Sequence, residues 1–254
     1  MPKLTDAQVS SFNRRVPGLG TYLQGVAAGN NSFKDYFDGL VNTGNAVVDD
    51  CDALNINTFD DNTKFNAVLD ITRVFKGTGS TKLQSLKVTA TGSKAYKVIA
   101  SADWSGSSKI GLLIFSDVSL AAGDLKYYIK DSVAGDQLVN VPAVTAGVPS
   151  RVAIDVSGLT RTAVIRYGFQ CNKAAIFNVN IDQIVRYGTN AVSLTKTPII
   201  GTDVKIASMI KANTGAHTKT ALVEDTDFVV LQDAKKVAFI TDQSLNTCEC
   251  EYRV

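Results

Sequence analysis

The amino-acid sequence predicts a mainly β protein, and three observations support this prediction. First, 67 of the 254 residues are Val, Thr or Ile, whose branched side chains suit a pleated strand. Second, Asp outnumbers Glu by 21 to 3, and Asp favours turns whereas Glu favours helix surfaces. Third, apolar and polar residues alternate from about residue 66 onward, as expected for strands with one solvated face.

Length and charge exclude several classes of protein. The chain carries 26 Lys and Arg against 24 Asp and Glu, a balance untypical of disordered tails and of nucleic-acid-binding domains. A length of 254 residues corresponds to one large or two modest domains. The longest clean apolar run, residues 110–115, is much shorter than the roughly 20 residues of a membrane-spanning helix. The N-terminus lacks a secretory signal pattern, so we expect synthesis in a cytoplasm and no membrane partner.

Residues 1–65 are predicted to form an N-terminal helical or extended arm. Thr5 and Gln8 have the spacing of a capping box, which predicts a short helix over residues 5–16. Ser32, with Asp35 three residues later, is expected to begin a longer helix. The segment has too few apolar residues for a core of its own, so its apolar stripes should dock on the body or on another chain. The expected assembly residues are Phe12, Val16, Phe33, Phe37, Leu40 and Val41.

Residues 66–190 are predicted to form a β-sandwich. Alternating or apolar runs separated by turn-rich segments indicate short strands, and no helical pattern of 10–15 residues lies between them, which argues against βαβ units. The strands are expected at residues 86–91, 96–101, 110–115, 125–130, 152–156, 163–169 and 176–187.

Residues 191–254 are predicted to form a second, small β domain. Residues 227–231 and 235–240 are two strand-like runs around a polar turn, which is the pattern of a β-hairpin. Further short strands are expected at residues 204–210, 221–224 and 247–253.

The four cysteines are candidates for disulfides. Cys248 and Cys250 should share one face of a strand with Tyr252, and a bond between two such neighbours would be strained. Their better partners are Cys51 and Cys171, or the same cysteines in a neighbouring subunit. The alternative is four buried thiols that pack as small apolar side chains.

The sequence predicts no catalytic residue, metal site or cofactor. The only histidine, His217, lies in a polar, glycine-containing segment that is typical of a loop. Among 21 Asp residues some pair will be close enough for glycoside hydrolysis, but we expect such pairs to cap turns and not to act as acid and base. The adjacent or alternating pairs are Asp49 and Asp50, Asp60 and Asp61, and Asp225 and Asp227. We therefore do not expect an enzyme.

Three aromatic residues are candidate glycan contacts. Trp104 lies beside a Gly/Ser-rich turn, and Tyr127 and Tyr128 are adjacent in an expected strand, so one of these tyrosines should point outward. The alternative, which we favour, is that these rings fill the sandwich or a contact between chains.

Three segments resemble the galactose-binding-like jelly rolls found in carbohydrate modules. Residues 109–131 resemble a strand pair of that fold, residues 141–156 resemble the segment leading into the next strand, and residues 176–186 resemble its closing strand. Such domains occur in secreted glycan-binding proteins and in tailed-bacteriophage virion proteins. The C-terminal Glu224-Asp-Thr-Asp-Phe228 is similar to a hairpin pattern of phage structural proteins. Together with the arm and the small β domain, these features resemble a capsid decoration, or cement, protein.

The resemblance implies a structural role in a phage virion. The chain would form a homo-oligomer, expected to be a trimer, and would stabilise the shell by contacts with itself and with the major capsid protein. It would be made in the host cytoplasm and located in the virion, without nucleic acid, membrane or cofactor as a partner. The alternative hypothesis is a glycan-binding module that uses the jelly roll in an attachment, fibre or collar component.

Overall fold

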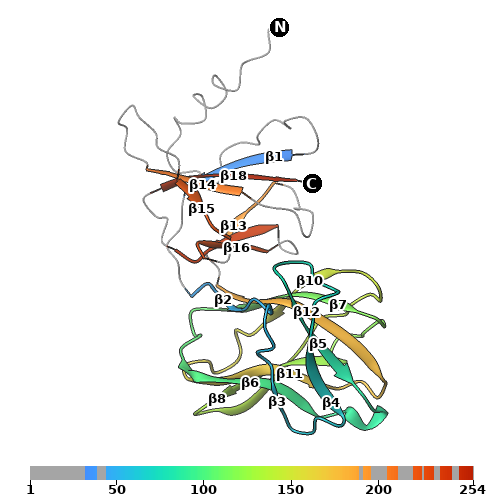
Figure 1. Ribbon diagram of the computed structural model, residues 1–254. Helices are drawn as coiled ribbons and strands as arrows, with labels where there is room; N and C mark the ends of the chain where they lie inside the picture. The colour runs from blue at the N-terminus through green and yellow to red at the C-terminus, as the bar shows by residue number, and fades with distance from the viewer. Residues whose placement is uncertain are drawn as a thin grey trace. The chain divides into compact units, whose positions relative to one another are not determined.

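In the computed structural model, antiparallel strands make up nearly all the regular structure of the described residues, as predicted (Figure 1). The structure describes residues 32–38, 44–188, 191–195, 205–210, 220–224, 226–231, 235–241 and 246–253. These residues belong to two units, of which the larger consists mainly of Thr43–Asn190. The smaller unit draws its residues from Met1–Asn42, Ala191–Val230 and Lys235–Val254. None of the helices in the described ranges is long and apolar enough to cross a membrane.

The larger unit is a jelly-roll β-sandwich of two antiparallel sheets. The first sheet contains β2 (Ala46–Asp49), β4 (Phe65–Asp70), β5 (Ser80–Ser85), β7 (Lys109–Ser116), β10 (Ser150–Asp155) and β12 (Phe177–Tyr187). Their order is β10-β7-β12-β5-β4, and β2 also pairs with β12. The second sheet contains β3 (Thr58–Phe59), β6 (Lys94–Ala102), β8 (Leu125–Asp131), β9 (Gly135–Asn140) and β11 (Val164–Cys171). Its order is β3-β6-β11-β8-β9.

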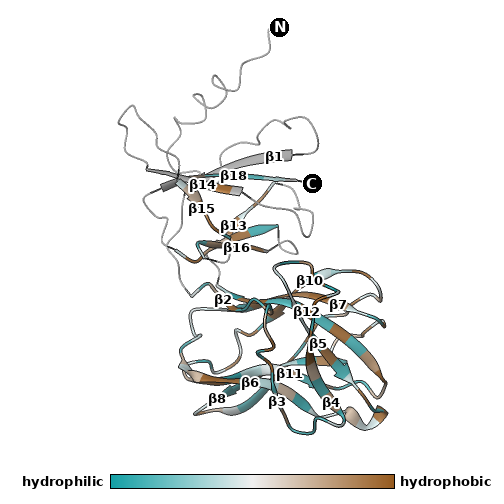
Figure 2. Cartoon of the chain, viewed as in Figure 1, coloured by the Kyte–Doolittle hydropathy of each residue, from teal (hydrophilic) through white to brown (hydrophobic). Residues whose placement is uncertain are grey.

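One hydrophobic core fills the space between the two sheets. On β12, Val179 and Ile181 are fully buried in this core, whereas Asn178 and Asn180 point to the opposite face. Because successive side chains of a strand point to opposite faces, the period of two separates core residues from the outer surface of the sheet. Figure 2 shows the resulting change of hydropathy along the strands of the sandwich.

Six of the seven predicted sandwich strands are confirmed, and the strand predicted at residues 86–91 is wrong. Strand β5 lies earlier, and the predicted strand contains only the 3₁₀ turn η2 (Val88–Ala90). The register explains this difference. Ser85 pairs with Phe65 at the start of β4 and with Phe177 at the start of β12. Both partner strands begin at this point, so the ladder ends soon after Ser85, with one further backbone bond from the Leu86 N–H to the Lys64 carbonyl oxygen at 2.8 Å.

The smaller unit contains two sheets around a second hydrophobic core. One sheet has the strands β1 (Ser32–Asp38), β18 (Asn246–Arg253), β14 (Lys205–Ile210) and β15 (Thr220–Leu222), in that order. The other has β13 (Ala191–Ser193), β17 (Lys236–Phe239) and β16 (Phe228–Leu231), which confirms the predicted C-terminal hairpin. Cys248, Cys250 and Tyr252 of β18 all enter this core, which confirms that they share one face.

The helix predicted to begin at Ser32 is wrong, because residues 32–38 form strand β1. This strand pairs antiparallel with β18 over its full length, from Ser32 opposite Arg253 to Asp38 opposite Thr247. The local sequence fits a helical stripe, but β18 offers a backbone partner for every residue, and such tertiary pairing overrides weak helix propensity. Phe33 and Phe37 lie on this strand. The remaining assembly residues, and the helix predicted over residues 5–16, lie outside the described residues: Phe12, Val16, Leu40 and Val41.

The division of the chain also differs from the predicted one. The sandwich was expected to begin at residue 66, yet β2, β3 and β4 all begin earlier and belong to it. Strand β1, expected in a separate arm, is part of the sheet that contains the C-terminal strand β18. The first strand of the described chain therefore completes a sheet whose other strands lie more than 160 residues later.

None of the four cysteines, all of which lie in the described ranges, forms a disulfide. Cys51, Cys171, Cys248 and Cys250 are each 0% exposed, and they pack in the two hydrophobic cores. Burial is also the main cause that raises the pKa of the Cys51 and Cys171 thiols. The expected bonds between them are therefore corrected to the alternative of buried thiols, and sulfurs at this depth are closed to a neighbouring subunit.

Gly168 on β11 marks a close approach to strand β6 in the second sheet. It pairs with Tyr96 on one side and with Tyr128 on the other, and the two tyrosine rings lie 5.7 Å apart between centroids. A Cβ atom at Gly168 would lie 2.2 Å from the Ala95 carbonyl oxygen. The rings thus cover a glycine that has no side chain of its own, as aromatic residues do beside other strand glycines.

We expect Gly168→Ala to lower the free energy of unfolding by about 1–3 kcal/mol, because the added methyl group meets backbone atoms. Gly158→Ala is the matched control, since a Cβ atom there would meet nothing within 4 Å. Chemical denaturation of both variants checks this prediction. Equal stability losses in the two variants would show that the close approach at Gly168 does not matter.

Candidate functional site

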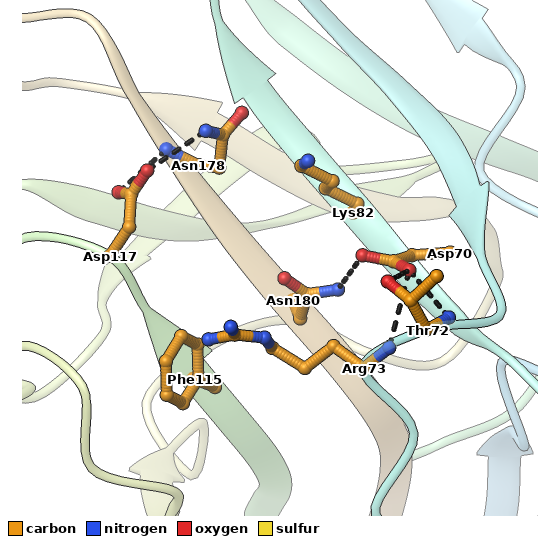
Figure 3. Close-up of a pocket in the computed structure, with 8 residues that line it drawn as sticks. All are labelled: Asp70, Thr72, Arg73, Lys82, Phe115, Asp117, Asn178 and Asn180. Carbon is orange, nitrogen blue, oxygen red and sulfur yellow. Dashed lines mark hydrogen bonds between the residues drawn. The ribbon is translucent and has the colours of Figure 1, made fainter.

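A hollow of about 210 Å³ lies on the first sheet of the sandwich. Strands β4, β5, β7 and β12 and the segments that follow β4 and β7 supply its lining (Figure 3). Seven of the eight lining side chains are polar or charged, and the eighth is a phenylalanine. The lining consists of Asp70, Thr72, Arg73, Lys82, Phe115, Asp117, Asn178 and Asn180.

Strand register brings the centre of the site together. Asn180 of β12 pairs with Phe115 of β7 on one side and with Lys82 of β5 on the other. Val68 of β4 pairs with Lys82 and extends the same row. In paired antiparallel strands, residues directly opposite each other place their side chains on the same face. Four neighbouring strands therefore present one continuous row on the outer face of the sheet.

The two carboxylates of the site are held by hydrogen bonds from neighbouring residues. Asp70 Oδ1 accepts bonds from the backbone N–H and hydroxyl of Thr72, at 2.8 and 2.6 Å, and Asp70 Oδ2 accepts one from Asn180 Nδ2 at 3.0 Å. The Thr72 hydroxyl is the main cause that holds the pKa of Asp70 well below its usual range. Asp117 accepts bonds from the backbone N–H and the Nδ2 of Asn178, at 2.9 and 2.8 Å.

Phe115 forms the apolar part of the site. The guanidinium carbon of Arg73 lies 3.8 Å from the centroid of the Phe115 ring, a cation–π contact that is visible in Figure 3. The ring of Phe75 stacks on Phe115 at a centroid distance of 6.1 Å. Both Arg73 and Phe75 come from the segment between β4 and β5, so the conformation of this segment decides how one wall of the site is built.

Two buried or half-buried carboxylates anchor the segment between β4 and β5. Asp182 Oδ2 accepts hydrogen bonds from the backbone N–H groups of Phe75 and Lys76, the latter at 3.0 Å. Asp52 Oδ1 accepts bonds from the backbone N–H groups of Thr78 and, at 2.9 Å, of Gly79. Charge-assisted bonds of this kind are stronger than neutral ones. The segment therefore has a defined conformation although it contains no strand or helix.

Asp182 lies at a bulge of β12, where the pairing with β7 shifts between Ile181 and Gln183. Its side chain is fully buried, and Asp182 Oδ1 has no hydrogen-bond partner among the described residues. Burial is the main cause that raises the pKa of this carboxyl to about 6, and the charge of Asp52 adds to it. The backbone N–H groups of Phe75 and Lys76 act in the opposite direction.

The three aromatic residues predicted as glycan contacts are buried elsewhere. Trp104 is 4% exposed, Tyr127 is 0% exposed, and both belong to the sandwich core. Tyr128 does point to the outer face of the second sheet, as expected for one of the two tyrosines, but it packs against Tyr96 and is 1% exposed. None of the three rings has a face free for a sugar, which agrees with the structural role we favoured.

The acidic pairs of the sequence act mainly as turn caps where the structure describes them. Asp49 Oδ1 accepts a bond from the backbone N–H of Cys51, and Asp50 and Asp61 cap the residues two positions later. Asp227 accepts a bond from the backbone N–H of Val223. Within the described ranges, no group of three or more His, Cys, Asp or Glu side chains could hold a metal ion. Asp225 and His217 lie outside these ranges.

Sequence reasoning missed the residues of the site for a physical reason. The predicted sugar contacts are Trp and Tyr residues, whereas the ring of this site is Phe115, which lies in a strand predicted from an apolar run. The alternation Asn178-Val179-Asn180 was a usable signal, because two amides on the outer face of a predicted strand mark it as a polar surface. Arg73 and Phe75 carried no such signal, since a long-range contact with Asp182 positions their segment.

A scan of protein-family models finds no match, and neither does a search of curated protein sequences. Among solved structures, the chain is similar to a family 11 carbohydrate-binding module from Clostridium thermocellum, in complex with a β-1,3-1,4-mixed-linked tetrasaccharide. The identity is 15% and the TM-score 0.43, over 57% of this chain and 96% of that chain.

Two further solved structures have similar values. A family 30 carbohydrate-binding module of a cellulosomal cellulase of Clostridium thermocellum has 15% identity and a TM-score of 0.38, over 61% of this chain and 98% of that chain. An exo-β-agarase has 12% identity and a TM-score of 0.41, over 60% of this chain and 25% of that chain. The function proposed below rests on the residues of the present chain.

We expect the contribution of Asp182 to the stability of the protein to fall as the pH rises from about 4 to about 6. The folded protein holds the Asp182 proton with a pKa of about 6, whereas an unfolded aspartate has a pKa of about 3.9, so protonation favours the folded state. Above a pH of about 6, Asp182 is ionised in the folded protein, and the burial of its charge lowers the free energy of unfolding to its full extent. In Asp182→Asn this contribution is absent.

Urea denaturation of both proteins from pH 4 to pH 8 measures this effect. The difference in free energy of unfolding, wild type minus variant, should decrease up to about pH 6 and be constant at higher pH. Taking the difference cancels the other carboxylates. A difference that is independent of pH, or that grows with pH, would contradict the raised pKa of Asp182.

Proposed function

We propose that the sandwich is a glycan-binding module and that its site is the hollow on the first sheet. The observation that carries the proposal is the combination of one aromatic ring, Phe115, with a surrounding set of fixed hydrogen-bonding side chains. Sugars have an apolar C–H face and a rim of hydroxyl groups, so they bind where an apolar surface and positioned polar groups meet.

The polar groups of the site are positioned before any ligand arrives. Asp70 is tied to Thr72 and Asn180, and Asp117 is tied to Asn178, so their side chains have little rotational freedom left to lose. Binding to such a surface avoids part of the entropy cost of ordering side chains.

The capsid decoration hypothesis stays a prediction, because no observation on the described residues tests it. The geometry of the hollow is more consistent with the glycan-binding alternative. Of the expected assembly residues, Phe33 and Phe37 lie on a strand that pairs within the chain itself. We propose binding without turnover, since each described carboxylate of the hollow is engaged by neighbouring residues.

We expect the full-length protein to bind at least one polysaccharide in a panel of neutral and acidic glycans, and Phe115→Ala to weaken that binding at least about tenfold. Affinity electrophoresis identifies the ligand, and isothermal titration measures the dissociation constant. A thermal melt shows whether the variant is folded. Val133→Ala is the control, since Val133 is 81% exposed on the turn between β8 and β9 of the other sheet.

Two results would contradict the proposal. The first is no binding to any glycan of the panel by folded wild-type protein. The second is binding that Phe115→Ala leaves unchanged, which would place the site elsewhere on the molecule.

A further inference from the structure

We propose that the site selects acidic glycans, whose carboxylate or sulfate groups bind between Arg73 and Lys82. This inference rests on the proposed function, and it deepens that proposal by naming the chemical class of the ligand. The inference is based on a difference within one hollow: the two carboxylates accept hydrogen bonds from neighbouring residues, whereas the two cationic groups have no such partner among the described residues (Figure 3).

The two cationic groups are the unused hydrogen-bond donors of the site. Among the described residues, neither the Lys82 ammonium nor the Arg73 guanidinium has a hydrogen-bond or ion-pair partner, and no dashed line reaches either group in Figure 3. Other lysines of the sandwich are paired: Lys109 with Asp155 at 2.6 Å, and Lys173 with Asp124 at 2.8 Å. The hollow thus contains two carboxylates, yet its own lysine and arginine are left unpaired.

The two carboxylates, in contrast, already accept hydrogen bonds from neighbouring residues. Asp70 accepts four hydrogen bonds, two from Thr72, one from the backbone N–H of Arg73 and one from Asn180. Asp117 accepts two from Asn178. These bonds hold the lining in place and use up much of the capacity of the carboxylates to accept further bonds. The hollow therefore offers donors in excess, and it needs a ligand that supplies acceptors.

The stack on Phe115 determines how Arg73 can act. A guanidinium group that lies on a ring face keeps its N–H bonds in a plane, directed outward from the edge. This plane matches the two oxygens of a carboxylate or two oxygens of a sulfate, which accept a pair of parallel bonds. A neutral hydroxyl can accept only one of them. Arg73 should therefore bind an acidic substituent more tightly than a neutral one.

The formal charges of the lining cancel, since Arg73 and Lys82 are balanced by Asp70 and Asp117. The expected selectivity therefore comes from short-range contacts, and long-range attraction to a basic surface contributes little. This distinguishes the site from a general polyanion-binding patch. Binding of the acidic glycan should weaken with salt only modestly, because a ligand group paired at close range is screened less than one at a distance.

The test uses two pairs of polymers with the full-length protein. One pair is a polyuronate and the same polymer after reduction of its carboxyl groups, and the other is a sulfated galactan and its desulfated form. Each pair keeps the sugar backbone and changes the anionic group. The wild-type protein should bind the acidic member of at least one pair about tenfold more tightly than the neutral member. The pair that shows the effect identifies carboxylate or sulfate as the preferred group.

Charge-removing variants locate the effect. Lys82→Gln and Arg73→Gln should each move the acidic-to-neutral affinity ratio towards one, and Arg73→Lys should recover only part of the ratio because it keeps the charge and loses the planar fork. Lys126→Gln is the matched control. Lys126 also lies on a strand, β8, with a half-exposed side chain, but on the other sheet of the sandwich.

The outcomes separate this inference from the proposed function. Equal affinity for both members of each pair, with binding that depends on Phe115, would overturn the acidic selectivity and leave the glycan-binding proposal intact. An acidic preference that survives both glutamine variants, or that Lys126→Gln lowers equally, would also overturn the inference. Failure to bind any of the four polymers or the wider panel would overturn both.

Discussion

The pairing of β12 with its neighbours is the constraint on which the sandwich and the candidate site both depend. Residues 177–181 of this strand pair with β5, its C-terminal residues pair with β2, and β7 lies along its other edge. This register sends Val179 and Ile181 into the core and leaves Asn178 and Asn180 on the outer face. A shift by one residue would exchange the two sets, so the core that stabilises the sheet also fixes the composition of the outer surface.

The described acidic residues of the sandwich act largely on the backbone, and this organises the molecule around its turns. Asp70 and Asp155 bond to backbone N–H groups two residues later, while Asp52 and Asp182 act over a much longer stretch of chain. The same chemistry thus closes local turns and fastens the segment that carries Arg73 and Phe75. The abundance of Asp relative to Glu follows from this use, because the short aspartate side chain reaches nearby backbone N–H groups that a longer one overshoots.

The local sequence pattern predicted a strand correctly where a neighbouring strand pairs with it along its whole length. The prediction failed where the presence or absence of a neighbouring strand determined whether the segment became a strand. Strands β7, β8 and β11 follow the predicted segments closely. The segment after Ser85 alternates like a strand, but its partners end there, and the segment after Ser32 has helical spacing, but β18 supplies a partner throughout. The candidate site was harder still. Its ring and its arginine come from segments 42 residues apart, joined by a cation–π contact that no local pattern encodes.

The sequence by itself determined the class of fold, the position of most strands, the turn-capping role of the aspartates and the shared face of Cys248, Cys250 and Tyr252. These properties depend on residues close together in the chain, whose periodicity and side-chain chemistry are visible in the letters. Only the tertiary structure decided that Trp104 and Tyr127 are buried, that the cysteines are thiols, and that Arg73 lies over Phe115 in the same hollow as Lys82. The reason is physical: register and core packing join segments far apart in the chain, and burial is a property of that joint arrangement.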